Sequence, residues 1–133
     1  MSTGAVYKDA YLDAGLGSGH TDEFPNTVYI ALFTSQTSDS GGGTEVDAPG
    51  YGRVAVPNND ANWPVAVNGQ KTNGLTITFP EAGASWGTVT HYAIMDAAEA
   101  GNFIHHGPLP PRAVAVGESP TFHPGTIVIL VGS

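Results

Sequence analysis

The chain lacks cysteine and has little charge. Charged residues make up 12% of its 133 positions, roughly half of what is usual for a globular protein. The absence of cysteine excludes a disulfide framework and thiolate metal sites, and it fits either redox compartment. The 18 glycines and 10 prolines favour many turns over long solvated helices. The length allows one domain with one hydrophobic core.

Basic residues and long apolar runs are scarce too. Four Lys and Arg stand against twelve Asp and Glu, which gives a formal net charge of −8. Nucleic acid and an anionic membrane surface are therefore poor partners, because like charges repel. The longest apolar run, Ile127 to Val131, is far too short to span a bilayer. Met1 to Asp13 has no basic region followed by an apolar one, so we expect no signal peptide.

One segment has helical spacing. Residues 5–14 place Ala5, Tyr7, Tyr11 and Ala14 about three to four positions apart, and glycines then end the pattern. We expect one short helix here. It lies in an N-terminal segment, residues 1–26, that we interpret as a docking arm in which Tyr7 and Tyr11 contact a partner.

The other apolar runs are typical of β-strands, because they are short, β-branched and bounded by Gly, Pro, Asn or Asp. They predict strands at residues 27–34, 52–57, 74–79, 87–95, 102–106, 111–116, 120–123 and 126–131. Many short strands without crossover helices predict an all-β domain over residues 27–133. We expect an antiparallel β-sandwich of jelly-roll type.

Two connections are long, at residues 35–51 and 57–73. Long loops in a compact domain are often functional or become ordered against a partner. Tyr51 and Trp63 lie in or beside them, so both are candidate partner contacts. For Trp63, local packing is an equally good interpretation, whereas Trp86 is expected in the core.

Gly83 to Gly87 match the G-x-S-x-G pattern of a hydrolase nucleophile, and Asp96, His105, His106 and His123 follow in the matching order. Such a nucleophile needs a helix after the serine. The sequence after Ser85 predicts a strand, and the chain is too short for an α/β-hydrolase. We therefore expect no enzyme.

Metal and nucleotide sites have little support. His105 and His106 are adjacent in a predicted strand and point to opposite faces, so they cannot share one ion. His91 adds at most a second ligand, fewer than zinc sites use. Surface or interface histidines with ordinary hydrogen bonds are the better interpretation. Asp39, Glu45 and Asp47 lack the EF-hand spacing, and Gly15 to Gly19 lack the elements that flank a phosphate loop. We expect no metal and no cofactor.

Several segments together resemble a known family. They are Tyr29 to Thr34, Thr44-Glu45-Val46, Gly50 to Arg53, Ile77 to Pro80, Trp86 to Ala97 and Gly101-Asn102, followed by a closing apolar strand. In this order they resemble small virion proteins of tailed bacteriophages, labelled tail-fibre, head-fibre, minor capsid or decoration proteins. The resemblance spans residues 27–131, and Trp86 to His91 are its most specific part.

The pattern also suggests structural roles. Glu45 and Arg53 are expected to pair and fix the first long connection, and Trp86 to plug the end of the sandwich beside Gly87. Asp96, with Gly101 and Asn102, suits a tight connection between two strands. Departures from the pattern are the doubled His105-His106 and the prolines at 108, 110 and 111, which remove donors from an edge strand.

The resemblance implies a virion protein. The first hypothesis is a decoration protein that docks as a homotrimer on the major capsid protein lattice and stabilises the head. The alternative is a tail-fibre or receptor-binding module that contacts host glycan or protein. Because the chain has neither heptads nor repeats for a fibre shaft, the sequence favours decoration.

Overall fold

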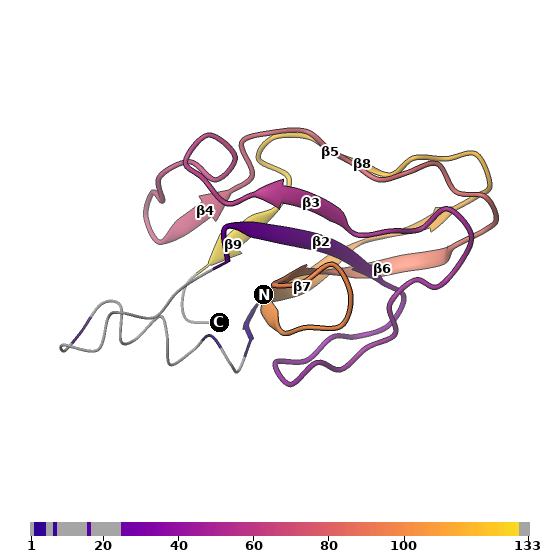
Figure 1. The fold of residues 1–133 in the computed structure, drawn as a ribbon, viewed down its shortest axis with the longest axis horizontal. Helices are drawn as coiled ribbons and strands as arrows, with labels where there is room; N and C mark the ends of the chain where they lie inside the picture. The colour runs from indigo at the N-terminus through magenta and orange to yellow at the C-terminus, as the bar shows by residue number, and fades with distance from the viewer. Residues whose placement is uncertain (1, 5–6, 8–15, 17–24, 131–133) are drawn as a thin grey trace.

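The computed structural model describes residues 2–4, 7, 16 and 25–130 (Figure 1). Their regular elements are strands: β1 (Ser2–Thr3), β2 (Thr27–Phe33), β3 (Val54–Pro57), β4 (Gln70–Thr72), β5 (Ile77–Thr78), β6 (Gly87–Met95), β7 (Phe103–Val114), β8 (Thr121–Phe122) and β9 (Val128–Leu130). Each described strand pair is antiparallel. The structure thus confirms the all-β prediction.

The strands form one large sheet and two small ones. The five-stranded sheet has the order β1-β7-β6-β2-β3, and the two-stranded sheets are β4-β9 and β5-β8. In the large sheet Tyr29 of β2 lies opposite Ala55 of β3 on one side and Met95 of β6 on the other. The neighbours of β2 therefore come from segments far apart in the sequence.

The core lies between the sheets. Side chains alternate along β2, so Ile30 and Leu32 face one side and Ala31 and Phe33 the other. The first side joins a cluster that includes residues of both small sheets, and Figure 1 shows the β5-β8 pair above the large sheet. The second side forms a separate cluster in which Phe33 packs edge-on against Phe103, with ring centroids 5.5 Å apart. Because both faces of β2 are covered, its sequence is a continuous apolar run rather than an alternating one.

One strand differs from its prediction. The sequence predicts two strands, at residues 102–106 and 111–116, but β7 runs without a break through Pro108, Pro110 and Pro111. On its outer side β1 pairs only with residues 105–106. On its inner side the register shifts between Val89 and His91, which lie opposite Arg112 and Pro108. Prolines are tolerated in such an edge and bulge because no ladder donor is needed there.

Two strands lie where the sequence predicts none. Polar β4 falls within the predicted loop 57–73, and its pattern carries no apolar alternation. Strand β1 falls within the N-terminal segment. The predicted helix over residues 5–14 lies outside the described residues except for Tyr7. Among residues 2–4, 7, 16 and 25–130 there is no helix with the length and apolar character that a membrane span requires.

Candidate functional site

The first long connection, residues 35–51, is fastened by Arg53. Its Nε and Nη2 donate to Glu45 Oε2 and Oε1 at 2.9 and 2.8 Å. Its Nη1 donates to the carbonyl oxygens of Ala97 and Ala100, both at 2.8 Å. Glu45 and Arg53, which we expected to pair, thus also hold the turn after β6.

Tyr51 completes this network. Its hydroxyl donates to Glu45 Oε2 and accepts from the backbone N–H of Leu32. Burial would raise the pKa of Glu45, yet the hydrogen bonds from Arg53 and Tyr51 and the Arg53 charge bring it below its usual value. Burial, and then the bond to Glu45, raises the pKa of Tyr51. Carboxylate and guanidinium therefore remain charged, as in a structural pair rather than an acid–base site.

Trp86 lies beside this network. Its indole is buried, Nε1 donates to the carbonyl of Pro49 at 3.1 Å, and its ring meets the Tyr51 ring edge-on at 5.4 Å. Tyr51 also stacks on Phe79 at 6.3 Å, so most of its ring is packed inside rather than offered to a partner. Gly87 has a φ of 81°, a region that favours glycine and turns the chain past the indole.

The second long connection, residues 57–73, is anchored by Trp63. This side chain is only 5% exposed and belongs to the main core. It is therefore packed locally, and its indole is not on the surface where a partner contact would need it. At the end of the connection, buried Asn73 donates to the carbonyls of Leu75 and His123 and accepts from the N–H of Ile127. These contacts fix the base of the connection on both sides.

Two valines beyond Trp63 are exposed instead. Val65 is 76% and Val67 66% exposed. Asn68 and Gly69 have φ values of 53° and 76°, and Val67 and Gln70 exchange backbone hydrogen bonds of 2.9 and 3.0 Å. This is a tight hairpin, for which Asn-Gly is a strong sequence signal. The Asn-Gly dipeptide could therefore have predicted this turn from the sequence alone.

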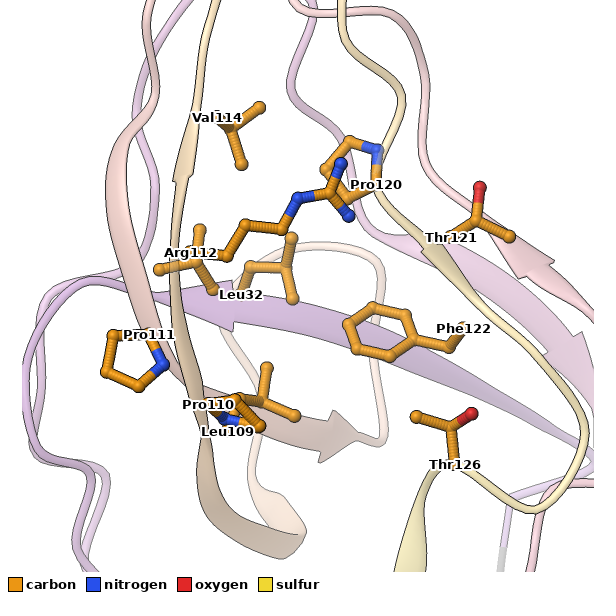
Figure 2. A pocket seen from close by; sticks show the side chains of 11 residues that line it. Leu32, Leu109, Pro110, Pro111, Arg112, Val114, Pro120, Thr121, Phe122 and Thr126 are labelled. Carbon is orange, nitrogen blue, oxygen red and sulfur yellow. The ribbon is translucent and has the colours of Figure 1, made fainter.

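A hollow of about 400 Å³ lies between the second half of β7 and residues 120–126. Figure 2 shows the Arg112 guanidinium and the Phe122 ring reaching over it from its two walls, with Leu109 below. We call it the β7 groove. It is lined by Leu32, Val89, Leu109, Pro110, Pro111, Arg112, Val114, Pro120, Thr121, Phe122 and Thr126. Its lining is mostly apolar, and of these residues only the prolines of β7 stand out in the sequence.

Arg112 is the charged group of the β7 groove. Its only described ion pair, to Glu118, is long at 3.5 Å, and both side chains are about half exposed. Such surface pairs contribute little. The guanidinium therefore remains available to an occupant of the groove.

His105 and His106 of β7 are buried, so these two are not the surface histidines that we named as one possibility, although His106 does make ordinary hydrogen bonds. His105 lies opposite Ile94 and His106 opposite Ala93, residues of the two different core clusters, so the side chains point to opposite faces as expected. His106 is held through Nδ1 by Thr37 Oγ1 and through Nε2 by Asp39 Oδ1, each at 2.7 Å. It thereby ties the start of the first long connection to the sheet.

A second hollow, of about 360 Å³, lies over His106 and is also lined by His91 and Asp39. Burial, and then the charge of His106, lowers the pKa of His91. Among the described residues, no three histidine or acidic side chains are grouped so that they could hold a metal ion. Asp39 and Glu45, two of the acidic residues considered above for an EF-hand, bind His106 and Arg53.

Ser85 of the G-x-S-x-G pattern and Asp96, the acid that follows it in the sequence, have separate hydrogen-bond partners. Ser85 Oγ accepts from the N–H of Gly87, and β6 follows it in place of the helix that a hydrolase nucleophile needs. Asp96 accepts from the hydroxyl of Tyr7 at 3.0 Å and from the N–H of Asn102 at 2.7 Å. Tyr7 is itself buried, and Tyr11 lies outside the described residues.

Comparison with protein families gives one result that bears on function. Residues 4–130 match the family described as "Podophage GP4 fiber I protein gp80". No curated protein matches the chain.

Proposed function

Because the chain belongs to this family of podophage fibre proteins, we propose that it is a structural subunit of the bacteriophage virion that acts as a fibre module. The match over residues 4–130 carries the proposal, since it spans nearly the whole chain. The family description favours the fibre over the capsid decoration that the sequence alone favours. Its location is then the assembled virion.

The arrangement of the described residues suits a passive, rigid module. Both long connections are anchored by side chains that pack inward: Arg53, paired with the partly buried Glu45, holds the first, and buried Trp63 holds the second. The proposal includes a jelly-roll-like sandwich, supported by the core that joins the large sheet to both small ones. Its contacts would be made without catalysis.

Decoration of the head is the second candidate. The observation that favours it is the lack of heptads or repeats from which a fibre shaft could be built. In this case the chain would dock as a trimer on the major capsid protein; Ser2, Thr3 and Tyr7 of the segment 1–26 would stay packed on the chain's own sheet. In the fibre proposal the partners are further copies of the chain and a host glycan or protein.

Copy number and position in purified virions test the proposal. We expect a few to a few dozen copies per particle by quantitative mass spectrometry, with antibody-gold label on fibres. Hundreds of copies spread over the head would replace the fibre proposal with decoration. Absence of the chain from purified virions would overturn both.

A further inference from the structure

The dipeptide Asn-Gly occurs twice in the sequence, at Asn68-Gly69 and at Asn73-Gly74. Asparagine loses its side-chain amide most readily before glycine, because glycine has no Cβ to hinder attack by its backbone nitrogen. A β-branched residue precedes both asparagines, valine in the first case and threonine in the second. Their intrinsic reactivities are therefore nearly matched, and the fold decides which of the two reacts.

The first dipeptide is open to reaction. Asn68 and Gly69 are both exposed, in the two-residue turn between Val67 and Gln70. The two hydrogen bonds that close this hairpin use only the backbone of Val67 and Gln70. Among the described residues, none forms a hydrogen bond with the Asn68 amide or the Gly69 N–H. A Cβ built on Gly69 would meet nothing within 4 Å, so the backbone has room to rotate into the reactive geometry.

The second dipeptide is held at the groups that would have to move. Asn73 is 1% exposed, and its side-chain amide makes the three hydrogen bonds described above. The Gly74 N–H, which would be the attacking group, donates to the carbonyl of Asn62 at 2.6 Å. A Cβ on Gly74 would lie 2.5 Å from the carbonyl oxygen of Ala61, so this backbone is closely packed. Asn73 can therefore react only after this part of the fold opens, which is a rare event in a packed region.

We propose that Asn68 is a site of spontaneous deamidation in the folded protein and that Asn73 is protected from it. The Gly69 nitrogen attacks Asn68 Cγ, a new C–N bond forms, and the bond between Cγ and Nδ2 breaks. The amide leaves as ammonia, with the proton that the Gly69 nitrogen gives up. Water then opens the resulting succinimide ring at either of its carbonyls, which yields aspartate or isoaspartate.

Either product changes the hairpin. Residues 61–70 contain no charged side chain, so deamidation places the first negative charge in this segment. Isoaspartate also adds a methylene to the main chain, which disturbs a two-residue turn with φ values of 53° and 76°. This inference goes beyond the proposed function and does not depend on it. In a virion, whose subunits are not renewed after assembly, the products would accumulate with the age of the particle.

Peptide mapping of the purified chain tests the proposal. Folded protein is kept in warm neutral buffer, and samples taken over time are digested with trypsin and analysed by mass spectrometry. Cleavage after Lys71 places the two asparagines on separate peptides. We expect Asn68 to deamidate at least about tenfold faster than Asn73. In protein unfolded in urea the two rates should become similar, because both dipeptides are then equally free.

Two variants identify the product and the attacking group. Asn68→Asp carries the charge of the product, so aged protein should show a growing fraction that elutes with this variant on anion exchange. Gly69→Ala hinders ring closure and should slow the growth of that fraction. Circular dichroism would verify that both variants are folded.

An Asn68 that stays intact in the folded protein while it reacts in urea would overturn the proposal, because the hairpin would then protect it. Equal rates at Asn68 and Asn73 in the folded protein would overturn it as well. Either result leaves the virion assignment standing, because that assignment depends on the composition of the particle. Conversely, absence of the chain from virions would overturn only the proposed function.

Discussion

The Arg53 guanidinium binds the Glu45 carboxylate through two parallel hydrogen bonds, Nε to Oε2 at 2.9 Å and Nη2 to Oε1 at 2.8 Å. The Arg53 side chain is only 7% exposed. Because its remaining donor group holds the carbonyls of Ala97 and Ala100, this pair joins the turn after β6 to the connection that precedes β3. Its loss is expected to loosen two loops at once.

Arg53→Lys tests this linkage. An ammonium cannot reproduce the planar fork that reaches both carboxylate oxygens and two carbonyls. We expect the free energy of unfolding in urea to fall by about 2–3 kcal/mol. Arg112→Lys, at a half-exposed arginine, should change it by less than about 0.5 kcal/mol. Equal effects of the two substitutions would contradict the assigned role of Arg53.

Glu45 makes part of the stability depend on pH. Burial alone would raise its pKa, but the bonds from Arg53 and Tyr51 bring it below the ordinary 4.5. A carboxyl whose pKa is lower in the folded state stabilises the fold fully above the unfolded value. It loses this contribution as the pH falls through the folded value. The contribution of Glu45 is therefore expected to be intact above pH 4.5 and to fade in more acidic solution.

Melting temperatures measured from neutral pH down to about pH 3 would show this. The gap between the unmodified chain and Glu45→Gln should be constant above pH 4.5 and narrow below it. Glu81→Gln, at an exposed carboxylate, serves as the control and should show no comparable change. A gap that widens on acidification would reverse the sign we assign.

The sequence predicted the strands whose patterns are strong. Strand β6 has the predicted bounds, residues 87–95, and β2 differs from its prediction by one residue, because turn residues bound both runs. The sequence could not predict β4, whose Gln70–Thr72 are polar and are placed by pairing with β9. It also divided β7 at prolines that the edge of the sheet tolerates.

Less of the candidate site than of the fold could be predicted from the sequence. The pairing of Glu45 with Arg53 followed from a family pattern and from opposite charges, which sequence can carry. The β7 groove joins Leu109 and Phe122 across a gap in sequence, and only tertiary packing brings them together. The sequence left the role of Trp63 open, because a tryptophan with polar neighbours can be either a buried anchor or an exposed partner contact.

Alanine substitutions at two glycines with the same φ distinguish the cost of backbone strain from the cost of a steric clash. Gly50 and Gly117 both have a φ of 86°, but a Cβ on Gly50 would lie 2.3 Å from the carbonyl oxygen of Glu81, whereas none of the surrounding atoms is within 4 Å at Gly117. Gly117→Ala should cost about 1 kcal/mol of unfolding free energy, from strain alone. Gly50→Ala should cost about 3 kcal/mol or more, because backbone must move.

Urea denaturation of both glycine variants provides the comparison. Similar losses of unfolding free energy in the two variants would mean that the backbone around Gly50 shifts at little cost. That result would contradict a rigidly anchored first connection.

The two tryptophans are equally buried but differ in hydrogen bonding, which gives a matched pair of substitutions. Trp86 Nε1 donates to Pro49, whereas Trp63 Nε1 is buried without a hydrogen-bond partner among the described residues. Both phenylalanine variants lose ring volume, but only Trp86→Phe loses a bond, so it should be the less stable by about 1 kcal/mol. Each variant keeps one tryptophan, whose fluorescence follows unfolding in urea. If Trp63→Phe were the less stable, the Trp63 indole N–H would need a partner, and our account of Trp63 as the anchor of the second long connection would be wrong.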